Sequence, residues 1–241
     1  YGEVPYTEAL DLENFPTPKY DEGQVVYEGV IAEINEALEK VSASNIVCTN
    51  FLFPSSTADK WIQFANALKL KMLMRMSGVK DVQVAALLAE NNFPTADVSY
   101  KGCWKNEPGQ MNPFYSEEFA TTWGSTQTNI AANLAIIGTM QVKNSEGAVE
   151  YEDPRLAAFF QKNKSSEYIG GISGTNYPKS TSKLQDWCRP VATFDMPVYL
   201  ITVSEVEFFK AEYYARYGSA ADAATHYAAA IEASFASANV S

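Results

Sequence analysis

The residues best suited to chemistry in this sequence are aromatic side chains in two stretches without helical periodicity. The first stretch runs from Asp97 to Gly124 and the second from Lys162 to Val198, and both are rich in turn-forming residues. A planar ring can stack on the apolar face of a sugar, while Asn, Gln, Asp and Arg side chains bind its hydroxyl groups. The six candidate ligand-binding rings are Tyr100, Trp104, Tyr115, Trp123, Tyr177 and Trp187.

These rings also have a purely structural interpretation. Aromatic side chains more often pack a loop onto its neighbouring helices than face solvent. We therefore expect some of the six to be buried and at least one or two to stay exposed. On this basis alone, the sequence predicts an acidic, mostly helical protein with a candidate binding surface in its loops.

Catalytic chemistry has little support in the sequence. A hydrolase of the Ser-His-Asp or Cys-His type needs a base, and the single histidine, His226, lies in an Ala-rich segment without a neighbouring nucleophile. A glycosidase needs two carboxylates across a cleft, for which Asp153, Glu117 and Glu118 are the nearest candidates. Asp153 is placed to cap a helix and the two glutamates are typical of a solvated face. No catalytic residue is predicted.

Charge and cysteine content exclude several kinds of partner. The net charge is −11 and no basic cluster is dense enough to follow a phosphate backbone, so we expect neither nucleic acid nor an anionic membrane surface as a partner. Cys48, Cys103 and Cys188 lack the spacing of a zinc site, and one disulfide at most could form. Three unpaired thiols are the simpler expectation. The segment Gly170–Gly174 lacks the Lys of a phosphate loop, so no metal or cofactor is predicted.

One stretch, Asp59 to Met76, has the marks of a central helix. It follows the possible caps Ser55 to Thr57, ends before Gly78, and carries apolar residues around most of its circumference. Such a helix is expected to pack on several sides. Asn66 and Arg75 fall among the apolar positions, and each should find a hydrogen bond or reach the surface. A ligand-contacting role for this pair is the alternative.

Helical periodicity defines two antiparallel hairpins. We predict Asp21 to Lys40 paired with Asp59 to Met76, and Ser204 to Tyr217 paired with Ala220 to Ser237. The second hairpin alternates small and aromatic positions as tetratricopeptide repeats do. Predicted capping pairs are Asp21 with Gln24, Ser204 with Glu207, and Ser219 with Asp222. The predicted fold class is all-α, with tetratricopeptide-like hairpins, long irregular loops and minor strand content.

Shorter helices are predicted between the two hairpins. The pattern indicates helices from Val79 to Glu90 and from Ser125 to about Met140. A third begins at Asp153, where an N-cap is followed by Pro154 at the first helical position, and runs through Phe160. The stretch from Asp97 to Gly124 is expected to contain no helix.

Four segments, in order along the chain, resemble motifs of the SusD/RagB family of nutrient-binding lipoproteins of the Bacteroidetes outer membrane. They are Gly2–Tyr6 (Gly-Glu-Val-Pro-Tyr), Trp61–Arg75 in the central helix, Asp153–Leu156 (Asp-Pro-Arg-Leu) and Ser204–Glu212. Departures from the family pattern are mild: Glu3 stands where Asp is usual, Ala67 where Ser is common, Lys71 where Arg is common and Ser204 where Ala is common. Together the four segments cover nearly the whole chain.

The resemblance implies a function that the residues alone do not. It implies a single SusD-like domain over residues 1–241, with N- and C-terminal parts of the family lying outside it. It further implies non-catalytic glycan binding at the bacterial cell surface, an N-terminal lipid anchor outside this chain, and delivery to a SusC-like TonB-dependent transporter. A peptide-binding member of the family is the main alternative, and a glycoside hydrolase has less support. The family motifs contain no ligand residues, so the six rings rest on their loop placement.

Overall fold

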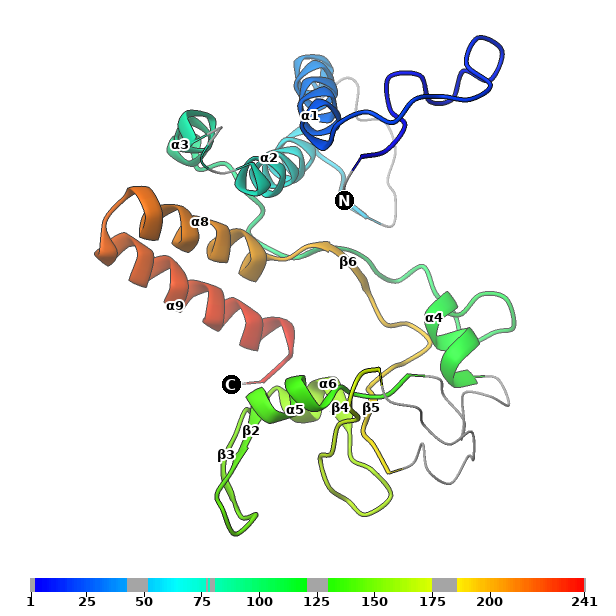
Figure 1. Ribbon diagram of the computed structural model, residues 1–241, viewed down its shortest axis with the longest axis vertical. Helices are drawn as coiled ribbons and strands as arrows, with labels where there is room; N and C mark the ends of the chain where they lie inside the picture. Colours follow the sequence, from blue (N-terminus) through cyan, green and yellow to red (C-terminus); the bar gives the residue numbers. More distant parts are fainter. Residues whose placement is uncertain are drawn as a thin grey trace. The chain divides into compact units, whose positions relative to one another are not determined.

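The computed structural model describes residues 3–42, 52–76, 78, 81–120, 130–174 and 186–240. The chain divides into two compact units (Figure 1). Unit 1 comprises Tyr1–Val98 and Tyr199–Ala230, and unit 2 comprises Ser99–Val198 and Ile231–Ser241. Helices dominate the described residues and the strands are short, which confirms the predicted fold class. The predicted single domain over residues 1–241 stays a prediction.

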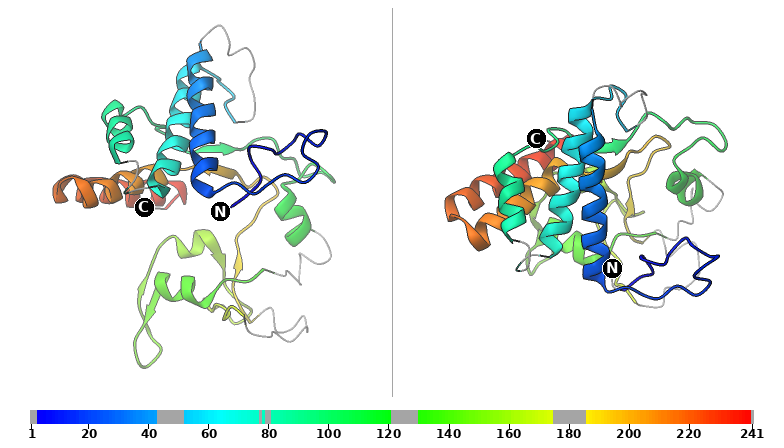
Figure 2. Two further views of the ribbon diagram at one scale, coloured as in Figure 1. Left: turned by 45° about the horizontal axis from the view of Figure 1, so that its top comes forward. Right: turned by 90° about the horizontal axis from the view of Figure 1, so that it is seen from above.

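Unit 1 is built from helical hairpins. Its helices are α1 (Gly23–Lys40), α2 (Ala58–Arg75), α3 (Asp81–Glu90), α8 (Val203–Tyr217) and α9 (Ala220–Ser237), of which α9 continues past the unit boundary at Ala230. α1 and α2 run antiparallel, as do α8 and α9 (Figures 1 and 2). Each helix begins and ends within two residues of its prediction, so both hairpins are confirmed.

Helix α2 forms the centre of unit 1, because α1, α3 and α8 all pack against it. Ala67 and Leu70 are fully buried, and Leu73 is nearly so. The buried Asn66 donates a hydrogen bond from Nδ2 to the carbonyl oxygen of Asn92 at 3.1 Å, which confirms a structural role for this polar residue. Thr57 is the cap, since its side chain accepts from the backbone N–H of Lys60.

A polar cluster couples α8 to α9. The Glu207 carboxylate lies 2.7 Å from Lys210 Nζ and 2.6 Å from His226 Nδ1, and the His226 ring stacks on Tyr214. Burial alone would raise the pKa of Glu207, but hydrogen bonds from Lys210 and His226 outweigh it and lower that pKa. The histidine thus has a structural partner, as its sequence context suggests.

The start of α1 differs from its prediction. Asp21 was expected to cap the helix with Gln24, but the helix begins at Gly23 and its N-cap, Glu22, makes no side-chain capping bond. Instead the buried Asp21 carboxylate accepts hydrogen bonds from the backbone N–H groups of Tyr6 and Thr7, at 3.1 and 2.8 Å. These upstream donors compete with the helix for the same oxygen atoms, and sequence spacing cannot reveal them.

A tyrosine fixes the segment before α1 onto that helix. The Tyr6 hydroxyl donates to Glu33 at 2.6 Å, and the ring lies against Gly29. A Cβ atom at Gly29 would lie 2.4 Å from the Tyr6 ring, so only glycine allows this close approach.

Helix α8 also has a different cap from the predicted one. Thr202 accepts from the N–H of Glu205 at 3.0 Å, whereas Ser204 donates its hydroxyl to the carbonyl oxygen of Ala230 at 2.8 Å. Ser204 therefore ties α8 to α9 and is not a cap. The predicted cap of α9 is confirmed, because Ser219 Oγ accepts from the N–H of Asp222 at 3.1 Å.

Unit 2 has shorter elements and its own apolar core. In chain order they are α4 (Pro113–Tyr115), the π-helix η1 (Ser116–Ala120), α5 (Leu134–Met140), β2 (Gln141–Lys143), β3 (Val149–Glu152), α6 (Leu156–Phe159), β4 (Phe160–Gln161) and β5 (Arg189–Pro190). β2 pairs with β3 and β4 with β5, both antiparallel, while β1 (Val98–Tyr100) pairs with β6 (Val198–Ile201). Ile137, Leu156 and Cys188 belong to the buried core of this unit.

Three predictions for this part of the chain need correction. The helix expected from Ser125 begins only at Leu134; residues 130–133 are not helical, and 125–129 lie outside the described residues. The stretch expected to lack helix contains α4 and η1. α6 runs from Leu156 to Phe159 and not from Pro154 through Phe160: Asp153 accepts from the backbone N–H of Arg155 as a cap would, but residues 154–155 form a turn and Phe160 begins β4.

Trp61 tests the central role of α2. Its ring packs edge-on against Phe53 at 4.9 Å, and its Nε1 donates to Ser56 Oγ at 2.8 Å. We expect Trp61→Ala to lower the free energy of unfolding by about 3 kcal/mol, near the low end for a tryptophan because the ring is only partly buried. Urea unfolding measures the change. Trp61→Phe, which keeps a ring, should lose about 1 kcal/mol; equal stability of all three proteins would contradict the packing.

The hydrogen bonds that the Asp21 carboxylate accepts from Tyr6 and Thr7 predict that the stability of the protein depends on pH. Backbone hydrogen bonding from Thr7 holds the pKa of Asp21 below its ordinary value. The stabilisation is therefore complete above the unfolded pKa of about 3.9 and is lost as the pH falls through the lower folded pKa. We expect Asp21→Asn to be less stable than the parent at neutral pH, with the difference shrinking below about pH 4. Urea unfolding across this pH range measures the stability difference. A difference that does not change with pH would argue that these hydrogen bonds to Asp21 do not stabilise the fold.

Candidate functional site

The candidate site is the aromatic segment of unit 2, defined here as residues 100–120. It leaves β1 at Tyr100, turns at Gly102 and Gly109, which both have positive φ, and ends in α4 and η1. Within it, the backbone N–H of Lys105 binds the carbonyl oxygen of Gln110 at 2.8 Å, closing a small loop. The segment is thus ordered by turns and short helical pieces, which places rings on a surface that regular helices do not provide.

Asn112 holds this segment in place. Its side chain is buried, and its Oδ1 accepts hydrogen bonds from the N–H groups of Phe114 and Tyr115, at 2.9 and 3.3 Å. Its Nδ2 donates to the carbonyl oxygen of Met196 at 3.0 Å, and its own N–H donates to that of Phe194 at 2.8 Å. Asn112 therefore caps α4 and ties it to the turn before β6.

Three rings form a cluster on α4 and η1. The rings of Tyr115 and Phe119 are nearly parallel, with centroids 6.2 Å apart, and the Phe114 ring lies 5.5 Å from Phe119. Phe114 is exposed and Tyr115 is half-buried. The π-helix supports this arrangement, since such turns are rare and recur at functional sites. The cluster offers a partly exposed aromatic surface of the kind that stacks on sugar rings.

The structure describes four of the six predicted ligand-binding rings. Tyr100 is exposed, while Trp104, Tyr115 and Trp187 are half-buried. Trp123 and Tyr177 lie outside the described residues. Among the described residues, ring contacts in this segment join Tyr115 to Phe119 and not to the other predicted rings.

Trp104 has an unusual environment. Its indole Nε1 is buried and finds no hydrogen-bond partner among the described residues. A buried donor left without a partner costs about 1 to 3 kcal/mol. Trp104 stays a candidate ligand-binding ring.

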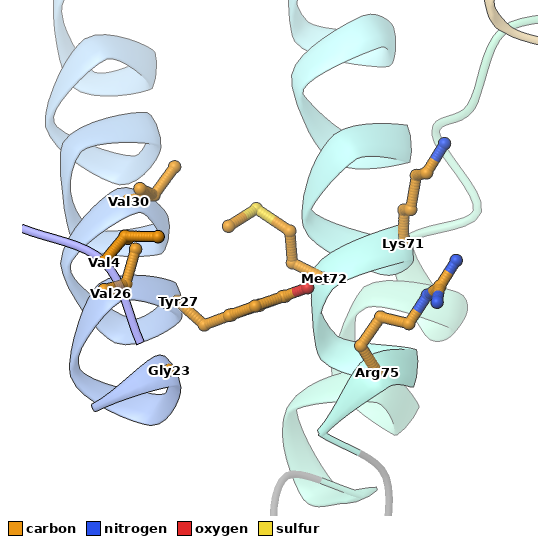
Figure 3. Close-up of a pocket in the computed structure, with 8 residues that line it drawn as sticks. All are labelled: Val4, Gly23, Val26, Tyr27, Val30, Lys71, Met72 and Arg75. Carbon is orange, nitrogen blue, oxygen red and sulfur yellow. The ribbon is translucent and has the colours of Figure 1, made fainter. Parts of the chain in front are cut away.

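Unit 1 has a pocket of about 410 Å³ between the start of α1 and the end of α2 (Figure 3). The residues that line it are Val4, Gly23, Val26, Tyr27, Val30, Lys71, Met72 and Arg75. Val26 and Val30 face Met72 across it, and Tyr27 reaches toward α2. Lys71 is paired with Glu205 at 2.8 Å. With mostly aliphatic walls, the pocket offers few groups for binding sugar hydroxyls, and we do not assign it as the glycan site.

Of the carboxylates considered for catalysis, Asp153 makes contacts that hold the fold together. Asp153 is buried and binds Arg155, whose hydrogen bonds lower the pKa of the Asp153 carboxyl. A carboxyl with a lowered pKa is a poor general acid at neutral pH. Arg155 also donates to Ser234 and lies over the Phe235 ring, so the pair anchors the end of α9 within unit 2. Among the described residues, no group of His, Cys, Asp and Glu side chains could hold a metal ion.

Comparison with known proteins identifies the family. A family model described as starch-binding and associating with the outer membrane, SusD-like, matches residues 1–239. The chain belongs to the SusD-like family. Proteins of this family bind nutrients such as starch, and the family is described as associated with the outer membrane. A comparison with curated protein sequences gave no match.

Solved structures of SusD homologues share the fold. One from Bacteroides uniformis is 21% identical with a TM-score of 0.79, covering 100% of this chain and 50% of that one. One from Parabacteroides distasonis is 21% identical with a TM-score of 0.74, covering 93% and 50%. A chitin-binding SusD homologue from Flavobacterium johnsoniae is 22% identical with a TM-score of 0.70, covering 100% and 49%. The chain thus spans about half the length of the structures it matches, and its helical architecture is that of SusD-like folds.

The site contains residues that the sequence prediction missed. Phe114 and Phe119 complete the ring cluster, and Asn112 positions it. A usable signal was present, because Asn112 followed by Pro113 is the same cap-and-proline pattern that was recognised at Asp153. No sequence pattern around Asn112 predicts its hydrogen bonds to the carbonyl oxygens of Phe194 and Met196, because these residues lie far along the chain.

We expect Asn112→Ala to destabilise α4 and η1. Losing the cap and leaving buried N–H groups unpaired should cost about 2 kcal/mol, measured by thermal unfolding, with faster hydrogen exchange in residues 113–120. Asn112→Asp keeps the capping oxygen atom but sets a second acceptor against the Met196 carbonyl oxygen, so it should slow the exchange of residues 113–120 relative to Asn112→Ala while still lowering stability. If both variants exchanged like the parent, Asn112 would not be holding the segment.

Proposed function

We propose that this protein binds a glycan without cleaving it, through the aromatic segment of unit 2. The single observation that carries the proposal is the exposed and half-exposed set of rings, Tyr100, Phe114 and Tyr115, in a segment held by Asn112 in a SusD-like chain. Half-exposed rings stack on sugar faces at little entropic cost, because packing already restricts them. Trp104 and Trp187, together with Trp123 and Tyr177 outside the described residues, remain candidate contributors.

The charge of the chain bears on which glycan it takes. With a net charge of −11, the protein repels polyanionic polysaccharides at long range, so a glycan without charged groups is the better ligand. Starch, named for the family, and chitin, bound by one structural relative, both meet this condition. We therefore propose an uncharged glycan of this kind as the ligand.

The cellular role extends beyond this chain. The protein, as proposed, acts at the outer-membrane surface of a bacterium, held there by an N-terminal lipid anchor, and passes its glycan to a SusC-like TonB-dependent transporter. Family association with the outer membrane supports this role. Within the described residues, no helix combines the length and apolarity needed to cross a membrane.

Ring substitutions test the proposal. Each stacked ring contributes on the order of 1 kcal/mol beyond area burial, so Tyr100→Ala or Tyr115→Ala should weaken glycan affinity several-fold to tenfold. Isothermal titration with maltoheptaose and chitohexaose on the intact protein measures the affinity. Tyr151→Ala is the matched control, because Tyr151 is an exposed ring of the same unit outside the aromatic segment.

Other outcomes distinguish the alternatives. Release of shorter sugars during the titration would indicate a hydrolase, and saturable binding of peptides but not glycans would indicate a peptide-binding protein. Equal affinity of Tyr100→Ala, Tyr115→Ala and Tyr151→Ala for the glycan would place the site elsewhere.

A further inference from the structure

The turn that precedes β6 lies against the aromatic segment. The backbone N–H of Asn112 donates to the carbonyl oxygen of Phe194 at 2.8 Å, and its Nδ2 donates to that of Met196 at 3.0 Å. The Oδ1 atom of the same side chain accepts from the N–H groups of Phe114 and Tyr115. One amide group therefore separates the turn from the backbone that carries these two rings, and the chain leading into β6 passes beside α4 in Figure 1.

Exposure alternates along this turn. Phe194 and Met196 are half-buried, whereas Thr193 and Asp195 are exposed. A hydrogen bond from the N–H of Met196 to the carbonyl oxygen of Thr193 closes the turn at 3.2 Å. Because Asn112 binds the carbonyl oxygens on both sides of Asp195, the backbone of that residue is fixed. The turn thus presents a hydroxyl and a carboxylate to solvent next to the aromatic segment.

The carboxylate of Asp195 is not needed by the turn that carries it. An aspartate in a turn commonly accepts a hydrogen bond from the backbone two residues further on and so closes the turn itself. Here backbone bonds and Asn112 hold the turn, and Asp195 makes no hydrogen bond or ion pair within the residues that the structure describes. Its two oxygen atoms are therefore available, on an ordered backbone, to a ligand that settles on the rings.

A sugar bound at the rings needs such an acceptor. A ring covers the apolar face of a sugar, but the hydroxyl groups at the sugar's edge lose water on binding and need new partners. The amide of Asn112 is already occupied by the backbone, and Gln110 is bonded to Glu107 at 2.6 Å. A carboxylate can accept from two neighbouring hydroxyls at once, and bonds to an ionised acceptor are the stronger ones.

The geometry points to Asp195 as the residue that accepts hydrogen bonds from the hydroxyl groups of the glycan, next to the rings of Phe114 and Tyr115. This inference rests on the proposed function and adds to it the group that orients the sugar on the rings. A carboxylate at this position also repels uronic acid and sulfate groups locally. The ligand class is therefore a glycan whose stacked sugar has free hydroxyl groups and no acidic group.

Substitution of Asp195 tests the inference, by isothermal titration of the intact protein with whichever of maltoheptaose and chitohexaose it binds more tightly. We expect Asp195→Ala to weaken affinity about tenfold, because the sugar hydroxyls then lose a charged acceptor, and to leave Tm unchanged. Asp195→Asn keeps one acceptor oxygen and should bind with intermediate affinity. Glu150→Ala is the matched control and should bind like the parent, since Glu150 is an exposed carboxylate on β3 of the same unit.

A matching change in the sugar separates direct contact from an indirect structural effect. We would use deoxy forms of the same oligosaccharide, each lacking one kind of hydroxyl group. One of these forms should bind the parent about tenfold more weakly than the complete sugar, yet bind Asp195→Ala about as well as the complete sugar does. Losses that fail to add in this way indicate that the two removed groups contact each other.

Several results would overturn the inference. If Asp195→Ala bound like the parent while Tyr115→Ala was weakened, Asp195 would lie outside the site and the proposed function would stand. Additive losses for every deoxy form, or a lowered Tm for Asp195→Ala, would show that the carboxylate serves the fold. Failure of the intact parent to bind either oligosaccharide would overturn the proposed function itself, and this inference with it.

Discussion

The burial of α2 is the constraint on which the rest of unit 1 depends. A helix that is apolar around most of its circumference is stable only when neighbours cover it, and here α1, α3 and α8 do so. Ala67 and Leu70 sit at the fully buried contact, where a small residue allows close approach and a large one fills the remaining space. Polar residues on the same helix are accommodated at its margin, as Lys71 is by Glu205.

Buried polar side chains order the irregular parts of the chain. Asp21, Asn112 and Asp153 each accept backbone N–H groups from a non-helical or barely helical segment. These segments lack a ladder of backbone hydrogen bonds, so a single carboxylate or amide supplies the partners that a regular element would provide for itself. The same device therefore fixes the segment before α1 in unit 1 and the aromatic segment in unit 2.

The sequence predicted most of the fold because helical periodicity is a local property. Both hairpins and α3 follow from it, as does the cap at Ser219. Two predicted helix caps were wrong because a distant partner decided the outcome: Asp21 binds Thr7, and Ser204 binds Ala230. For the candidate site, the stretch rich in rings was predictable, but ring exposure was not, because it depends on contacts such as those of Asn112 with Met196.

The two described thiols differ in chemical reactivity. Burial raises the pKa of Cys188, and its Sγ contacts the backbone at Glu167 and Ile169, so this thiol stays protonated and slow to alkylate. Cys103 is unpaired and partly exposed, directly before Trp104. A fluorophore attached at Cys103 would sit inside the aromatic segment, giving the protein an attachment point for an optical sensor of whatever settles on those rings.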